Sequence, residues 1–256
     1  MVSASSRPLA AALVAVAALA AACSGGGKTQ PQEAAPAAVQ APIDPATAGS
    51  VTGHVTLLGA PPANQPIKTK SDPNCNVPIT RQDYIVDKSG HVANVFVYVK
   101  DGLGNRVFPV PVESVVLGQK HCQYEPHVLG IQVGQTLDII SSDPTLHNVH
   151  GGNRETNNRE FNLGQPVPDV KNQHSFSTKE VLYPFSCDVH KWMGAFLGIV
   201  DHPFYAVTST DGSFSLKGLP PGTYTIEAVH EKLGRQVQTV TLGQKETKDV
   251  AFTFKI

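Results

Sequence analysis

The sequence predicts an all-β protein built from two β-sandwiches. From Val51 onward, apolar residues come in short alternating runs, and Gly, Pro and Asn interrupt these runs. No segment has the apolar period of a long amphipathic helix, so sheets packed on sheets are the expected architecture. The segments expected to be strands are SVTGHVTLLG, HVANVFVYVK, LGIQVGQTLDII, HSFSTKEVLYPFSC, GAFLGIVDH, DGSFSLKGL, GTYTIEAVH and QVQTVTLG.

The composition sets the outer limits of this prediction. The chain has 256 residues, which is enough for one large domain or two modest ones. A hydrophobic fraction of 41% supports a real core, although the Ala-rich start inflates it. The net charge is -1 and only 16% of residues are charged, so no basic surface argues for a nucleic-acid partner.

The first 23 residues have the pattern of an export signal. A positive start precedes an unbroken apolar run at 9–22, which is too short to span a bilayer. The small residues before Cys23 resemble the lipobox of bacterial lipoproteins, with Ala20 where leucine is usual. The resemblance implies that Cys23 is lipidated and anchors an exported protein, facing the periplasm. Because Ser24 rather than Asp follows, we expect the outer membrane. The alternative is ordinary signal cleavage with an incidental cysteine.

Residues 24–49 are rich in Ala, Pro, Gly and Gln and lack an apolar period. Such a stretch buries too little surface to order itself, so it is expected to be a disordered tether, and the folded part to begin near Ser50. Two cysteines beyond it, Cys75 and Cys122, belong to no other motif and are expected to pair in an oxidising compartment. The alternative assigns Cys122, with His121 and His127, to a second metal site.

The C-terminal segment TSTDGSFSLKGLPPGTYTIEAVH (208–230) contains two alternating strands and two tight turns. It resembles the carboxypeptidase regulatory-like module, a transthyretin-like sandwich. The opening strands of that module occur well upstream here, as TGHVTL and NVFVYV. We therefore expect residues 50–100 plus 204–256 to form one sandwich, with residues 101–203 as a second domain inserted at a loop. Two consecutive domains are the alternative.

Residues that can bind a metal are concentrated in the expected inserted domain, residues 101–203. Seven of the ten histidines fall between residues 121 and 202, and FSCDVHKWMGAFLGIV sets Cys187, His190 and Met193 three residues apart. On a helix these three would share one face as ordinary core residues. However, Pro184 precedes the stretch and glycines interrupt it, so a loop between strands is expected. A loop in which the three only line a turn is the alternative.

The stretch VGQTLDIISSDPTLHNVHGG (133–152) points to the same place, because an apolar strand there leads into a turn and then His147. Structural zinc rarely takes methionine. One thiolate and two imidazoles with a distant thioether is instead the blue-copper arrangement. The sequence therefore predicts one type 1 copper site with the ligands His147, Cys187, His190 and Met193.

LHNVH and CDVHKWM resemble the ligand motifs of the cupredoxin family, and the short Cys-x-x-His-x-x-Met loop is similar to that of amicyanin. The resemblance covers about residues 112–202 and implies a Greek-key cupredoxin sandwich. It implies that Asn148 braces the ligand loops by hydrogen bonds. It also implies that the edge of His190 lies near the surface and passes the electron, with Trp192 and Ala195 adding apolar surface beside it.

The other histidines carry no spacing that requires a metal. His150 is expected either beside the ligands or on the surface, His202 at the domain junction, and His230 on the surface. His121, His127 and His174 are not taken as ligands.

A complete ligand set leaves no open position for a substrate, and no nucleophile motif occurs elsewhere. We therefore expect a one-electron carrier and not an enzyme. The expected partner is a redox protein such as a c-type cytochrome or a periplasmic dehydrogenase, met through a small, weak interface. The alternatives are copper storage or delivery, for which two methionines are few, and a surface-binding lipoprotein without a redox role.

Overall fold

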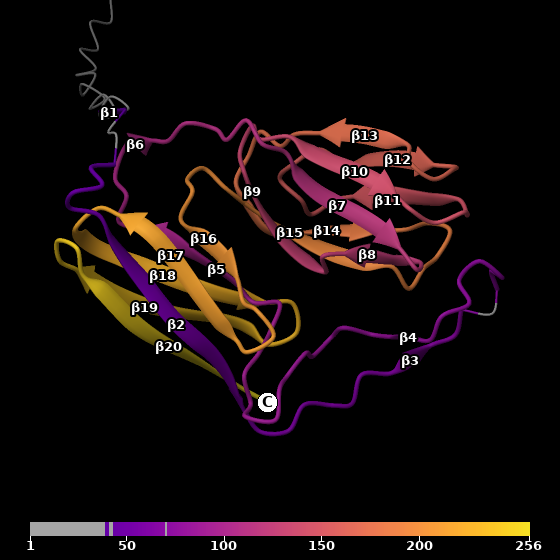
Figure 1. Cartoon of the computed structure of the whole chain (residues 1–256), viewed down its shortest axis with the longest axis horizontal. Coiled ribbons are helices and arrows are strands. Elements are labelled where there is room, and N and C mark those ends of the chain that lie inside the picture. Colours follow the sequence, from indigo (N-terminus) through magenta and orange to yellow (C-terminus); the bar gives the residue numbers. More distant parts are fainter. Residues whose placement is uncertain (1–38, 41–42, 70) are drawn as a thin grey trace, which may run out of the picture. The chain divides into compact units, whose positions relative to one another are not determined.

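The computed structural model describes residues 39–40, 43–69 and 71–256, and within them every regular element is a β-strand (Figure 1). The predicted all-β class is confirmed. The export signal, Cys23 and the tether up to residue 38 lie outside the described residues. None of the described residues belongs to a helix that is long and apolar enough to cross a membrane.

The first sandwich consists of one four-stranded sheet, in the order β16-β5-β18-β19, and one three-stranded sheet, in the order β17-β2-β20. Alternation explains why these segments form strands: in β2 every second residue is buried, and the same holds along most of β20. The strands are β2 (Gly49–Leu58), β5 (Phe96–Asp101), β16 (Tyr205–Val207), β17 (Ser213–Leu219), β18 (Gly222–His230), β19 (Gly234–Leu242) and β20 (Thr247–Lys255).

The second sandwich has a four-stranded sheet, β13-β10-β7-β8, facing a five-stranded sheet, β12-β11-β14-β15-β9. Their inner faces enclose a separate apolar core. The strands are β7 (Val115–Lys120), β8 (Gln123–Glu125), β9 (Val128–Gln132), β10 (Leu137–Ser141), β11 (His147–Gly151), β12 (Phe161–Gln165), β13 (Lys171–His174), β14 (Glu180–Ser186) and β15 (Gly194–Val200). In chain order these strands fall between β5 and β16, which are neighbours in one sheet of the first sandwich.

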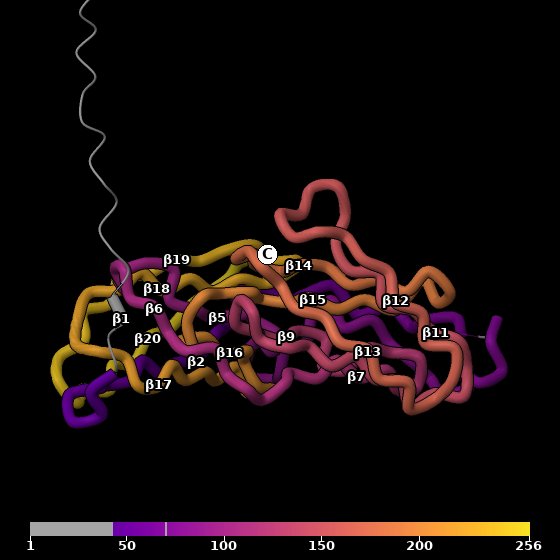
Figure 2. Tube along the Cα trace, turned by 90° about the horizontal axis from the view of Figure 1, so that it is seen from above, coloured from indigo at the N-terminus to yellow at the C-terminus, as the bar shows by residue number. Residues whose placement is uncertain are grey.

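The two sandwiches meet where β5 and β16 lie beside β9 and β15 (Figure 2). Two glycines allow this close approach. A Cβ atom at Gly130 would overlap the ring of Tyr205, and one at Gly198 would overlap the ring of Phe96. At both positions, the aromatic ring occupies the space that the Cβ atom of any residue other than glycine would need.

The structure differs from the expected domain division in two places. The connection between β2 and β5, expected to lie wholly in the first sandwich, carries the short pair β3 (Pro66–Ile67) and β4 (Ile79–Thr80) and buries Cys75 in the core of the second sandwich. Regular structure also begins before residue 50, within the segment expected to be a disordered tether. There β1 (Val39–Gln40) pairs with β6 (Arg106–Val107), and Ile43 packs on the first core.

Candidate metal centre

Two elements of the second sandwich position the expected ligands. His147 is the first residue of β11, while Cys187, His190 and Met193 lie on the connection from β14 to β15. β14 and β15 pair as far as Ser186 and Gly194, so the connection starts and ends on fixed strands. All four side chains are buried, with exposures between 0% and 3%.

Three of the four expected ligands converge. Donor atoms of His147, Cys187 and His190 all lie within 4.8 Å of one another, and the two imidazoles face each other with their Nδ1 atoms 2.9 Å apart. The backbone N–H of His190 donates to Cys187 Sγ at 3.3 Å. Met193 packs in the same core cluster, and its backbone N–H donates to the His190 carbonyl at 2.8 Å, which closes the turn.

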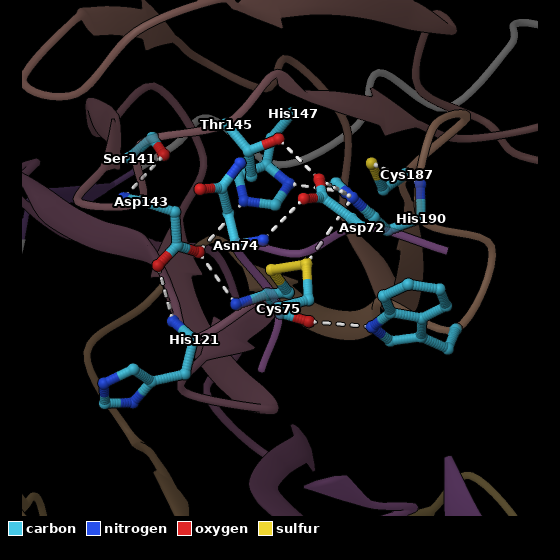
Figure 3. Close-up of a disulfide and its surroundings, with 12 residues drawn as sticks. Asp72, Asn74, Cys75, His121, Ser141, Asp143, Thr145, His147, Cys187 and His190 are labelled. Atoms are coloured by element: carbon cyan, nitrogen blue, oxygen red, sulfur yellow. Dashed lines mark hydrogen bonds and ion pairs between the residues drawn. A yellow bond between two sulfur atoms is a disulfide. The ribbon is translucent and has the colours of Figure 1, made fainter. Parts of the chain in front are cut away.

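Carboxylates hold the opposite nitrogen of each ring (Figure 3). His147 Nε2 lies 2.9 Å from an oxygen of Asp143, and His190 Nε2 lies 3.0 Å from an oxygen of Asp72. Because an ionised carboxylate only accepts hydrogen bonds, each Nε2 carries its proton and donates it. The pKa of Asp72 is lowered to about 2, first by the Thr145 hydroxyl and then by the Asn74 backbone N–H, so this carboxylate is ionised.

The positions of the protons on the two imidazoles show whether these residues fit a metal ion. With both Nε2 protons donated to carboxylates, both Nδ1 atoms present lone pairs to each other, and lone pairs at 2.9 Å repel unless a cation lies between them. Burial lowers the pKa of His147, which disfavours a shared proton as that cation. Two imidazoles, each with a carboxylate behind it, beside a cysteine sulfur are a donor set that fits copper or zinc.

Asn148 joins the two ligand-bearing segments. Its Oδ1 accepts the backbone N–H of Asp188 at 2.7 Å and lies 3.3 Å from Cys187 Sγ. Its Nδ2 donates to Asn162 and to the Asp188 carboxylate, at 2.8 and 2.9 Å. The amide therefore ties β11 to the turn that carries Cys187.

Two expectations about the electron-transfer surface are wrong. The edge of His190 is not near the surface: the residue is 2% exposed, because Asp72 and the sulfur of Cys75, 3.6 Å from Nε2, cover it. Ala195 is fully buried, because it points into the core from β15. Trp192 is half-buried and its ring centre lies 5.0 Å from that of His190.

Cys75 and Cys122 form a disulfide, as predicted. Asp143 accepts the backbone N–H groups of His121 and Cys122 at 2.7 and 2.8 Å, so one carboxylate orients both His147 and the disulfide-bearing turn. The alternative metal site at Cys122 is therefore wrong for this structure, because its sulfur is bonded and the ring of His121 points away (Figure 3).

The remaining histidines have structural partners. His127 lies between Glu231 and the Gly194 carbonyl, and His150 lies between Glu160 and Asp188. His202 is buried and donates to the Val99 carbonyl, and His174 stacks on Phe161.

His230, expected on the surface, is 2% exposed, so that expectation is wrong.

Asp72 and Asp143 are the residues at this centre that the sequence analysis missed. Each follows a serine and precedes a proline, and Asp143 lies four residues before His147. That spacing is a usable signal for Asp143. For Asp72 the only signal is its position three residues before a cysteine expected to form a disulfide.

The comparisons with known proteins that find a match each cover only part of the chain. Residues 198–255 match the family model of the carboxypeptidase regulatory-like domain. A comparison with curated protein sequences finds no match.

Solved structures similar to this chain include copper proteins. Amicyanin from Paracoccus versutus is 19% identical, with a TM-score of 0.30, over 40% of this chain and 96% of that one. A purple cupredoxin from Nitrosopumilus maritimus is 21% identical, with a TM-score of 0.28, over 34% and 97%. The copper-containing nitrite reductase from Thermus scotoductus SA-01 is 16% identical, with a TM-score of 0.32, over 39% of this chain and only 24% of the reductase.

Proposed function

We propose that this protein is a type 1 copper protein that carries one electron at a time. The observation that carries the proposal is the convergence of the donor atoms of His147, Cys187 and His190 within 4.8 Å, in a buried site at one end of a sandwich. Met193, buried on the same loop, would be the weak axial ligand.

Copper bound there would supply one-electron oxidation and reduction. The chain supplies a rigid and dry setting, in which Asp143 and Asp72 fix the two imidazoles and Asn148 fixes the turn that carries the thiolate. Ligands held in this way move little when the charge of the ion changes. No donor is left facing solvent for a substrate, which supports a carrier rather than an enzyme.

Since the edge of His190 is covered, we propose Trp192 as the route by which electrons reach the surface. Its ring lies beside His190, its Nε1–H donates to the Cys122 carbonyl at 3.0 Å, and it lines a groove of about 220 Å³. Charges of both signs line this groove, among them Lys191, Glu231 and Lys232. Such a mixed rim suits a weak encounter with a redox protein such as a c-type cytochrome or a periplasmic dehydrogenase.

The location belongs to the same proposal. The export pattern and the lipobox-like Cys23 support a protein that is lipid-anchored at a bacterial membrane and faces the periplasm. Labelling cells with a radioactive fatty acid tests this: wild type should carry the label and Cys23→Ser should not. An unlabelled wild-type protein would overturn the lipid anchor.

The central experiment is a titration of the purified protein with copper(II), followed by visible spectroscopy and voltammetry. We expect an intense thiolate-to-copper band that bleaches on reduction and returns on oxidation, and its loss in Cys187→Ser. His54→Ala is the matched control, because His54 is an exposed histidine on β2 of the other sandwich, and it should keep the band. A wild-type protein without the band, or a Cys187→Ser protein that keeps it, would refute the assignment.

Electron exchange tests the route separately from the site. Trp192→Leu should leave the band in place but slow the oxidation of reduced protein by a cytochrome c, because it removes the ring between His190 and the groove. Unchanged rates would exclude Trp192 as the route. Copper storage or delivery remains the competing function, and it predicts that the protein loses copper to a chelator on its first reduction.

A further inference from the structure

The edge of His190 is covered by a segment from outside the strands of the second sandwich. Asp72 and Cys75 lie on the loop between β3 and β4, whereas His190 lies between β14 and β15. Asp72 Oδ2 is 3.0 Å and Cys75 Sγ 3.6 Å from His190 Nε2, so both groups contact the side of the ring that faces away from Cys187 and His147 (Figure 3).

This contact is held from several directions. The Thr145 hydroxyl donates to Asp72 Oδ2 at 2.6 Å, and the Asn74 backbone N–H donates to Oδ1 at 2.8 Å. The disulfide from Cys75 to Cys122 fixes the loop three residues further on. The carboxylate therefore has one position, and that position suits the Nε2–H of His190.

We propose that Asp72 is a positioning residue of the metal centre, an inference that rests on the proposed function. By accepting the Nε2–H of His190, it keeps the Nδ1 lone pair directed at the site and prevents the ring from turning outward. A carboxylate behind a ligand imidazole also makes it a stronger donor. Its negative charge favours the more highly charged state of a bound ion, which lowers the reduction potential.

Two substitutions separate the hydrogen bond from the charge. Asp72→Asn keeps an oxygen that can accept the Nε2–H, so it should retain metal nearly as well as wild type while its reduction potential rises. Asp72→Ala removes the acceptor as well, and it should release metal about 10–100-fold faster to a chelator. Measuring release with zinc alone makes this readout independent of electron transfer.

The chain offers a matched control. Asp87 also binds a histidine, with its Oδ2 2.9 Å from His91 Nδ1, in the connection between β2 and β5 but away from the centre. Asp87→Asn and Asp87→Ala remove an equivalent carboxylate and should leave both zinc release and the reduction potential unchanged. If Asp72→Ala does not fold, the potential of Asp72→Asn decides the question.

Nuclear magnetic resonance of the zinc-bound protein gives a direct readout. The Nε2 protons of His147 and His190 should both be observed in wild type, since each is donated to a carboxylate, and only that of His190 should be lost in Asp72→Ala. The inference is overturned if Asp72→Ala keeps the His190 signal and releases zinc at the control rate, even where the copper band is intact. An absent copper band with the zinc results as expected would instead overturn electron transfer alone.

Discussion

Replacing both Cys75 and Cys122 with alanine should destabilise the second sandwich by about 4 kcal/mol. The disulfide joins residues 47 positions apart in the chain, and a loop of that length loses this much conformational freedom when it is closed in the unfolded state. Both residues are almost fully buried, so the bond also fixes the β3–β4 loop on the core. Without it, the loop keeps the hydrogen bonds of Asp72, the pairing of β3 with β4 and the packing of Ile79 on the core.

The single tryptophan makes the assay specific. Trp192 belongs to the second sandwich and bonds to the Cys122 carbonyl, so its fluorescence during guanidinium unfolding of the metal-free protein reports this part of the molecule. Wild-type protein unfolded in the presence of a reductant is the control and should match the double variant. A loss of less than about 2 kcal/mol, the lower end for a native disulfide, would refute the view that this bond holds the loop closed.

Three further predictions concern other positions. Gly198→Ala should destabilise the contact between the sandwiches by about 1–3 kcal/mol, because its Cβ would overlap the ring of Phe96, and Phe96→Leu should restore part of the thermal stability. Burial lowers the pKa of His230 from 6.5 to about 4, so only the unfolded chain takes up its proton between these values. The free energy of unfolding should therefore decrease as the pH is lowered across that window, by at most about 1.4 kcal/mol per unit, and this component should vanish in His230→Asn. Finally, Asn148→Ala should speed metal release about 10–100-fold in a chelator assay, since it frees the Asp188 turn. Each idea fails if the variant behaves as wild type.

The strands that the sequence predicts best are those with one buried and one exposed face. β2 and β17 alternate clearly and are bounded by turn residues. The polar segment at 151–173 gives no such signal, yet it contains β12 and all but the last residue of β13. Both strands lie at sheet edges, where little apolar surface is needed. β20 alternates as well as β17, but the strands expected from the sequence end at QVQTVTLG and miss it.

The residues of the metal centre also differ in how well the sequence predicts them. Cys187, His190 and Met193 are close in sequence, so their spacing alone suggests a common role. Asp72 lies 118 positions from His190, and its contact depends on how the β2–β5 connection folds over another sandwich. No local pattern contains that information.

The covering of His190 changes what can be inferred from its motif. A Cys-x-x-His-x-x-Met loop fixes which atoms face the ion, but it does not fix what lies behind the second imidazole. Here an ionised carboxylate and a disulfide lie there, and the ring is almost inaccessible to solvent. A partner that approached over His190 would meet the β3–β4 loop, whereas Trp192 lies beside the same imidazole and lines an open groove. The loop that shields the ligand therefore also restricts the surface from which a partner can reach it, and this restriction comes from a segment outside the metal-binding motif.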